Sequence, residues 1–290
     1  MRFQALIAAI ATTSPATVAG NRYQPVRHSA LTWAFLDAMV LAKRSLLQTL
    51  RVPQLVVFVT IQPVMFVILF RYVFGGAIHV PGGQYVNFLM PGIFVQTVAF
   101  GGVTTGIGLA EDMQRGLIDR FRTLPMSSSA VLTGRTIADL GRNFFTVVIM
   151  LIVGFIVGFR PGGSVPEFLL ALLVLMGFSF AFSWVSAFIG LIAKTAEAAQ
   201  SGGFIWMFPL TFASSAFVPV ATMPSWLQGF AKHNPVSVVA DSLRGLFHVN
   251  PDLTTADTRI ALIQSAAWIL GILAVFVPLS VIRYRRTTAG

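Results

Sequence analysis

The sequence contains no cysteine and few charged residues. Without cysteine the chain can form no disulfide, zinc–thiolate site or iron–sulfur cluster, and it has no thiol nucleophile. Charged residues make up 10% of the 290 positions, whereas a soluble domain carries about 25%. So little charge cannot cover a soluble surface, and an ordinary soluble globular enzyme is therefore excluded.

Recognisable catalytic and nucleotide-binding motifs are also absent. There is no GxxxxGK[ST] phosphate loop, no HExxH zinc motif and no GxSxG nucleophile elbow. The four histidines are scattered along the chain. We therefore predict that the chain is not an enzyme, with no catalytic residue, no metal site and no cofactor of its own.

Apolar residues are abundant: they make up 56% of the chain, and the mean hydropathy is +0.79. A helix that crosses a membrane needs about 20 mostly apolar residues, and we predict six such spans, of which the third is short and can borrow residues 139–143. The six are Leu55–Phe74, Phe88–Ala110, Phe144–Phe159, Phe168–Ala193, Gly202–Val220 and Ile260–Ile282. The predicted fold is an all-α membrane protein whose residues 54–290 form one six-span domain.

Two further segments precede the first span. Residues 1–29 are rich in Ala, Thr, Ser and Pro, and we interpret them as a flexible cytosolic tail. The alternative, a secretory signal peptide, fits less well because the apolar run is short. Residues 30–53 fit an amphipathic helix, since Phe35 and Met39 share one face and Arg44 lies on another. Such a helix beside a span is typical of one that lies in the membrane interface.

The basic residues predict the orientation. The net charge is +10, and 17 of the 20 basic residues are Arg. Fifteen fall on the side that carries both termini, and five fall on the other side: Arg71, Arg160, Lys232, Arg244 and Arg259. Because positive charge marks the cytoplasmic side of a membrane protein, we expect both termini in the cytoplasm. The hydropathy argues against the other reading of a basic chain, which is nucleic-acid binding.

Ionisable residues are essentially missing from the predicted spans, with Arg71 near the end of one. Ion-coupled carriers keep buried acids or bases in mid-membrane. We therefore expect that no ion gradient drives this protein.

The loop after the second span, residues 111–125, reads EDMQRGLIDRFRTLP. Helical spacing places Leu117 and Phe121 on one side, and Glu111 lies four residues before Arg115, a favourable order for an ion pair on a helix. A charged helix with an apolar ridge suits docking onto a cytosolic partner. The alternative is a solvated loop that only sets topology, and the residues alone leave both open.

Two predicted spans have weakly polar faces. Small residues repeat along one face of the second span: Thr97, Gly101, Thr104 and Gly108. The fifth span carries an aromatic and hydroxyl face: Phe204, Phe208, Thr211 and Ser215. Small residues allow close helix packing, which we favour for the second span over a lumen. The face on the fifth span fits either a path for an amphiphilic substrate or plain core.

The segment between the fifth and sixth spans contains two short predicted helices. Ser225 can cap the first, and Pro235 can start the second. Asp241 and Arg244 lie one turn apart, and we predict an exposed ion pair or capping contact between them. Because both helices are too short to span, we interpret them as external re-entrant or interfacial helices at the outer mouth.

These segments resemble a known family. The pattern E-D-x-x-x-G-x-x-D-R-x-R-x-x-P at Glu111–Pro125 is similar to the signature loop of type-2 ATP-binding-cassette exporter permeases. FVP at 217–219, MPxWL at 223–227, NP at 234–235 and DxxR at 241–244 are similar to the region before the last span of that family. The resemblance runs from about Leu31 to the C-terminus. It is greatest to the daunorubicin-resistance branch and extends to the mycobacterial lipid-exporting B subunits.

The resemblance implies a permease subunit that moves hydrophobic lipid, polyketide or drug substrates across the bacterial plasma membrane. It implies two separate ATPase subunits that carry ATP and Mg, and a second permease chain, with a paralogue favoured over a second copy. The signature loop would form a cytoplasmic coupling helix. This helix and the separate interfacial helix would contact the ATPases through Arg44, Glu111, Asp112, Arg115, Gly116, Leu117, Arg120, Phe121, Arg122 and Pro125. The paired second and fifth spans would line the substrate path: Thr97, Gly101, Thr104, Phe204, Phe208, Thr211 and Ser215. The outer segment would form an external gate: Trp226, Pro235, Asp241 and Arg244.

Two other classes stand beside this interpretation. A membrane-embedded lipid-modifying enzyme would need an acid, His or Ser cluster at the end of a span, and the sequence shows none. A structural membrane anchor or assembly factor would explain the lack of chemistry but not the similarity of the loop.

Overall fold

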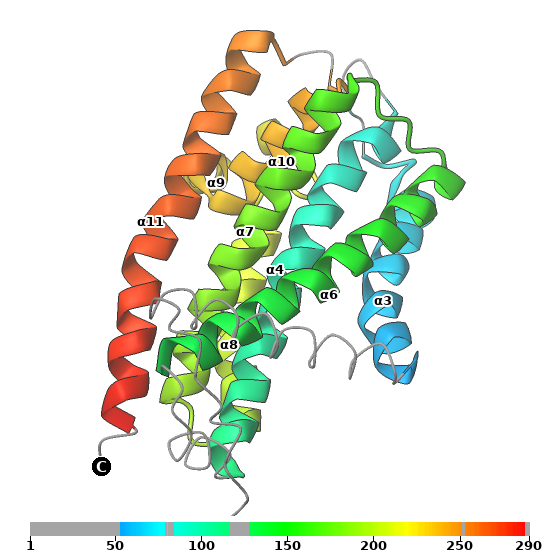
Figure 1. Cartoon of the computed structure of the whole chain (residues 1–290). Helices are drawn as coiled ribbons and strands as arrows, with labels where there is room; N and C mark the ends of the chain where they lie inside the picture. Colours follow the sequence, from blue (N-terminus) through cyan, green and yellow to red (C-terminus); the bar gives the residue numbers. More distant parts are fainter. Residues whose placement is uncertain (1–52, 79, 81–83, 116–127, 251–252, 288–290) are drawn as a thin grey trace, which may run out of the picture. The chain divides into compact units, whose positions relative to one another are not determined.

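The computed structural model describes residues 53–78, 80, 84–115, 128–250 and 253–287, and these form part of one compact unit, residues 34–290 (Figure 1). The predicted tail and nearly all of the predicted interfacial helix lie outside the described residues. Every regular element within the described ranges is helical. The elements are α3 (Pro53–Ile68), η1 (Leu69–Phe74, a π-helix), α4 (Tyr85–Gln114), α6 (Ser128–Val157), α7 (Val165–Ile192), α8 (Ala196–Phe212), η2 (Val220–Thr222), α9 (Ser225–His233), α10 (Pro235–Leu246) and α11 (Thr255–Thr287).

Four of the described helices are long and apolar enough to cross a membrane: α4, residues 132–157 of α6, α7 and residues 255–284 of α11. The all-helical membrane architecture is therefore confirmed, whereas six spans are not. The first predicted span contains a shorter apolar helix, Ile61–Phe74. The fifth falls short because α8 has 17 residues and ends at Phe212, eight residues before the predicted end.

The third predicted span begins much earlier than expected. Helix α6 starts at Ser128, so it also contains the charged residues Arg135, Asp139 and Arg142. These side chains lie against α4, where their partners are Asp112, Thr105 and Thr104, respectively. Paired charges are tolerated at positions where isolated ones are not. The expectation that this span lacks ionisable residues is therefore wrong for the helix as a whole.

Local chemistry accounts for two of the helix ends. Gly158 follows the last residue of α6 with a φ of 100°, a conformation that glycine adopts without the steric cost of a Cβ. Helix α7 begins after Ser164, whose backbone N–H and hydroxyl both donate to Glu167 Oε2, at 2.7 and 2.8 Å. Such a contact satisfies a donor at a helix start.

Helix α4 is the centre of the bundle. It packs against α3, α6, α7, α8 and α10, and in Figure 1 α6 crosses it obliquely. A Cβ placed on Gly106 of α4 would meet the backbone of Ser186 in α7, and one on Gly190 of α7 would meet the backbone of Gly106. These two glycines therefore permit the closest approach of α4 and α7.

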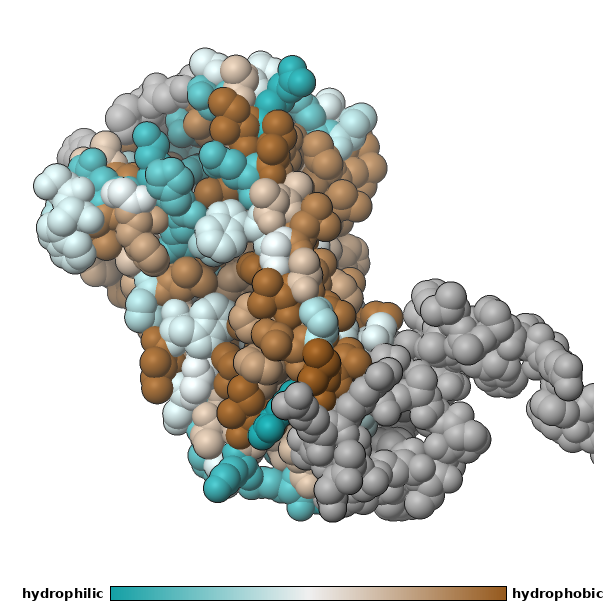
Figure 2. All heavy atoms as spheres, turned by 90° about the vertical axis from the view of Figure 1, so that its left-hand side faces the viewer, coloured by the Kyte–Doolittle hydropathy of each residue, from teal (hydrophilic) through white to brown (hydrophobic). Residues whose placement is uncertain are grey.

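Helix α11 presents much of its length outward. Only 6% of its most apolar stretch of 18 residues is buried. Its large exposed side chains are Ile260, Ile263, Trp268, Leu270, Val275, Leu279 and Ile282. Figure 2 shows this side of the molecule, with hydrophobic side chains along it and hydrophilic ones near its ends. An apolar exposed face of this length is suited to lipid.

Candidate substrate cavity and its polar supports

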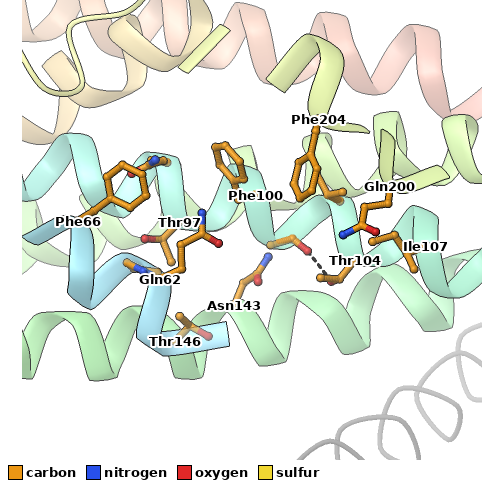
Figure 3. A pocket seen from close by; sticks show the side chains of 14 residues that line it. Gln62, Phe66, Thr97, Phe100, Thr104, Ile107, Asn143, Thr146, Gln200 and Phe204 are labelled. Atoms are coloured by element: carbon orange, nitrogen blue, oxygen red, sulfur yellow. Dashed lines mark hydrogen bonds between the residues drawn. The ribbon is translucent and has the colours of Figure 1, made fainter. Parts of the chain in front are cut away.

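A cavity of about 250 Å³ lies between helices α3, α4, α6 and α8 (Figure 3). Sites for drug-sized molecules are typically about 300–1,000 Å³ and mostly apolar, with a few polar groups. The cavity thus has room for part of such a molecule. Its lining consists of Gln62, Pro63, Phe66, Gln96, Thr97, Phe100, Gly101, Val103, Thr104, Ile107, Asn143, Thr146, Gln200 and Phe204.

Aromatic rings from three helices form one side of the cavity. Figure 3 shows Phe66 of α3, Phe100 of α4 and Phe204 of α8 along this side. The ring centroids of Phe100 and Phe204 are 6.0 Å apart, and the ring of Phe208 meets that of Phe100 edge-on at 5.4 Å. Such spacings are those of favourable aromatic pairs. These rings therefore make one side of the cavity apolar and aromatic.

Side-chain amides and hydroxyls form the polar part of the lining. In Figure 3 Gln62 approaches from α3, Gln200 from α8 and Asn143 from α6. Asn143 Nδ2 donates to the hydroxyl of Ser179 at 2.7 Å, which holds the amide in place. The lining includes no charged side chain of the described residues. Its polar groups are therefore neutral hydrogen-bonding groups.

A charged cluster supports the cavity between α4 and α6. The Asp139 carboxylate accepts a hydrogen bond from Thr105 Oγ1 at 2.5 Å and pairs with Arg142 at 2.7 Å. Arg142 also donates to the Thr104 hydroxyl and to the Gly101 carbonyl. The Asp139 side chain is 8% exposed, so its charge is held by these partners. Since Gly101 and Thr104 also line the cavity, the cluster fixes the position of its wall.

A second polar cluster centres on Arg244 of α10, whose side chain is fully buried. Its guanidinium donates to the carbonyls of Phe88 at 3.0 Å and Ser215 at 2.7 Å, and it pairs with Asp241 at 2.6 Å. It also lies over the Phe88 ring, 3.6 Å from the centroid. Burial lowers the pKa of Arg244 below its ordinary value, and the neighbouring Asp241 carboxylate offsets part of this shift. One side chain therefore ties α10 to the start of α4 and to the turn after α8.

The predicted contact between Asp241 and Arg244 is present, but the pair is not an exposed one, because Arg244 is fully buried. Asn234 adds to this arrangement. Its side chain accepts from the Val236 N–H to cap α10 and donates to the Leu210 carbonyl at 2.6 Å. Pro235 begins α10 as predicted. Ser225, by contrast, is the first residue of α9 and does not cap it.

Only some of the predicted substrate-path residues line the cavity. Thr97, Gly101, Thr104 and Phe204 line the cavity, whereas Phe208 reaches it only through its ring contact with Phe100. The other two are buried elsewhere. Thr211 lies close to the end of α8. Ser215 is not on α8 at all, and it belongs to the Arg244 cluster.

The predicted external-gate residues also lie on two different helices. Pro235, Asp241 and Arg244 lie together on α10. Trp226 lies on α9, and it is 80% exposed. The segment between α8 and α11 therefore contains a buried polar cluster and a separate exposed aromatic side chain.

Three of the predicted coupling residues lie at the end of α4. Glu111 and Arg115 form the expected i,i+4 pair at 3.6 Å, with the Arg115 side chain exposed and the Glu111 side chain partly exposed. Asp112 pairs with Arg135 of α6. The remaining predicted coupling residues lie outside the described residues: Arg44, Gly116, Leu117, Arg120, Phe121, Arg122 and Pro125.

Sequence reasoning missed the cavity residues on α3 and α6 and the charged cluster on α6. One signal was present: Arg135, Asp139 and Arg142 are spaced by four and three residues, which places them on one face of a helix. This pattern was missed because the predicted span began at Phe144, after all three residues. The glutamines of the cavity come from three separate helices, and no local pattern connects them.

Comparison with known proteins identifies the family. The ABC-2 type transporter family matches residues 37–248. The chain belongs to this family. It is 33% identical over 96% of its length to the daunorubicin resistance ABC transporter permease protein DrrB1 of Streptomyces coeruleorubidus, of which it covers 99%. It is 28% identical to the probable doxorubicin resistance ABC transporter permease protein DrrC of Mycobacterium tuberculosis, with 78% of this chain and 80% of that protein covered.

As an ABC-2 permease the chain is a multi-pass membrane transport subunit, and ATP hydrolysis belongs to a separate partner protein. The matched residues include every helix that lines the cavity and also Arg244, and they end before α11. The predicted resemblance to type-2 ATP-binding-cassette permeases of the daunorubicin-resistance branch is thereby confirmed.

Proposed function

We propose that this permease exports hydrophobic, drug-like molecules from a bacterial cell through a path that includes the cavity between α3, α4, α6 and α8. The observation that carries the proposal is the cavity itself, where aromatic rings and neutral amides meet inside a drug-resistance-type permease. Polyketide and lipid cargoes with an apolar ring or chain fit the same lining. Thr97, Gly101, Thr104 and Phe204 would contact the cargo.

The assembly that we propose contains two ATPase subunits and two permease chains, with a paralogue favoured as the second chain. ATP and Mg would bind to the ATPase subunits. The chain would lie in the plasma membrane with both termini in the cytoplasm. The loop after α4 would then face the cytoplasm, and α9 and α10 would lie toward the outer side as the external gate.

The coupling role of the loop after α4 can be tested at Phe121. Truncation of an aromatic anchor in an interface costs about 2 kcal/mol or more, which is roughly thirtyfold in affinity at about 1.4 kcal/mol per factor of ten. Phe121→Ala is therefore expected to reduce co-purification of the ATPase subunit and to stop export while membrane insertion stays normal. Co-purification from detergent-solubilised membranes and drug efflux from cells measure the two effects.

Arg122→Ala is the matched control in the same loop. A charge at the rim of an interface mainly tunes association and its salt dependence, so this variant should show a milder and salt-sensitive loss. Co-purification and efflux at wild-type levels in Phe121→Ala would show that the loop only sets topology.

The proposed orientation predicts that Ser225, at the start of α9, is reachable from outside the cell. Because the chain has no native cysteine, Ser225→Cys provides a single labelling site. A membrane-impermeant maleimide should label this variant in intact cells, whereas a cysteine added after Gly290 should react only after lysis. The reverse pattern would invert the proposed topology.

A further inference from the structure

Helix α3 and the π-helix η1 follow each other directly and together carry a single charged side chain, Arg71. One face of this element packs on the bundle, where Phe70 stacks on Phe217 with the ring centroids 4.4 Å apart. Another face is exposed, and α3 stands at the edge of the bundle in Figure 1. Helical spacing of four, three and four residues places four of the exposed side chains in one stripe: Ile61, Met65, Ile68 and Tyr72.

The length of this Ile61–Tyr72 stripe matches one leaflet of a bilayer. From Ile61 to Tyr72 the chain advances by eleven residues, which is roughly 15 Å at about 1.5 Å per residue. Half of a hydrocarbon core that is about 30 Å thick is also about 15 Å. One acyl chain of a lipid can therefore lie along the whole stripe, with its headgroup at the end that carries Arg71 and Tyr72.

The Arg71 guanidinium has no hydrogen-bond or ion-pair partner among the described residues. Its Nε is buried, and its two terminal nitrogens remain accessible. The ring of Tyr72 lies 5.9 Å from the guanidinium carbon, and within the described ranges the Tyr72 hydroxyl makes no hydrogen bond either. A charge beside hydrocarbon is costly unless it is paired. The end of the stripe therefore offers an unpaired cation and a free hydroxyl donor side by side.

A phosphate group suits these two donors. The planar guanidinium binds phosphate oxygens through parallel N–H donors, and a phenol can donate one further hydrogen bond. Long basic side chains and tyrosines near the end of a membrane helix reach the headgroup level. The positive charge that sets the predicted topology does not account for Arg71, because this residue is one of the five bases on the opposite side.

We propose that Arg71 and Tyr72 bind the phosphate of a phospholipid whose acyl chain lies along the Ile61–Tyr72 stripe. In the proposed orientation of the chain this lipid belongs to the outer leaflet. The site lies on the outside of the bundle, so the bound lipid is distinct from any cargo in the cavity. Charge complementarity favours a phosphate here, because Pro53–Phe74 contains no acidic residue.

The test measures lipid binding to the full chain in dodecyl maltoside by native mass spectrometry. Three probes separate headgroup from tail: dioleoylphosphatidylglycerol, dioleoylglycerol, which has the same tails without a phosphate, and inorganic phosphate, which has no tails. The wild type is expected to bind its first phosphatidylglycerol about tenfold more tightly than dioleoylglycerol, a ratio that corresponds to about 1.4 kcal/mol. An excess of inorganic phosphate should not displace this lipid.

Four variants divide the site into its parts. Arg71→Gln should abolish the preference for phosphatidylglycerol, whereas Arg71→Lys, which keeps the charge without the planar fork, should retain part of it. Tyr72→Phe removes one neutral donor and should weaken phosphatidylglycerol binding only about threefold. Met65→Gln places a polar group in the middle of the stripe and should weaken both lipids equally. Without lipid, Arg71→Gln should unfold at the wild-type temperature or above, because it removes an unpaired charge.

Arg160→Gln is the matched control. Arg160 is an exposed base on the same side of the predicted topology, but its guanidinium already donates to the carbonyls of Phe155 and Phe159, both at 2.8 Å. This variant should bind phosphatidylglycerol as the wild type does.

Four results would overturn the inference. The first two are wild-type phosphatidylglycerol binding by Arg71→Gln, and equal binding of phosphatidylglycerol and dioleoylglycerol by the wild type. Displacement by inorganic phosphate would indicate a site for the free ion. A wild-type chain that is dimeric and binds no phosphatidylglycerol, but becomes monomeric as Met65→Gln, would show that a second copy of the permease covers the stripe.

Discussion

Arg244→Ala is expected to destabilise the permease by about 3 kcal/mol, the lower end of the cost of removing one partner from a buried ion pair, because the Asp241 side chain that stays behind is 36% exposed. The guanidinium is fully buried and serves the carbonyls of Phe88 and Ser215 together with the Asp241 carboxylate. Its removal takes a donor from each of these acceptors, leaves the Ser215 hydroxyl at 3.3 Å as the remaining donor to Asp241, and removes the polar link between α10 and α4. Thermal unfolding in detergent, followed by size-exclusion fluorescence, should show a midpoint several degrees below that of the wild type.

Two companion variants separate charge from geometry. Arg244→Lys keeps a charge but has no planar fork to serve several acceptors at once, so its midpoint should lie between those of the wild type and Arg244→Ala. Lys232→Ala removes an exposed basic residue from the neighbouring helix α9 and should leave the midpoint unchanged. A wild-type midpoint for Arg244→Ala would mean that the cluster adds little to the fold.

The sequence predicts helices well where apolar length decides the outcome. The runs around α4, α7 and α11 were long enough to be placed within a few residues of their observed bounds. The start of α6 was misplaced because Arg135, Asp139 and Arg142 look incompatible with an apolar helix until their partners on α4 are known. Hydropathy measures each residue alone and cannot register that pairing.

The end of α8 was misplaced for a related reason. Residues 213–220 are apolar or weakly polar, so the hydrophobic run continues, but the helix stops at Phe212. The carbonyl of Ser215 is bound by Arg244, 29 positions along the chain. A long-range contact of this kind draws the chain into a turn, and the local sequence gives no sign of it.

The cavity was predictable in part. Helical periodicity placed Thr97, Gly101 and Thr104 on one face of α4, and these residues do line it. Gln62, Gln96 and Gln200 were missed because they come together only when α3, α4 and α8 pack. No pattern within any one helix marks these glutamines as cavity residues. They line the same cavity only because the three helices pack together.

Gly190→Ala should have the second large effect, because it acts on a direct backbone contact between helices α4 and α7. A Cβ at this position would meet the Gly106 carbonyl oxygen, carbonyl carbon and Cα, and a backbone cannot move aside as a flexible side chain can. Helices α4 and α7 would have to separate. Overpacking of this kind costs about 1–3 kcal/mol and occasionally more.

The shift would also disturb transport, because α4 supplies six of the cavity residues between Gln96 and Thr104 as well as Ile107. Gly190→Ala should therefore lower both the thermal midpoint in detergent and drug efflux from cells. Gly271→Ala is the matched control: it makes the same change in helix α11, where nothing lies within 4 Å of the new Cβ. This control should match or exceed the wild-type midpoint, since alanine favours a helix over glycine by about 1 kcal/mol. Equal midpoints for Gly190→Ala and Gly271→Ala would show that α4 and α7 are not in close backbone contact at this position.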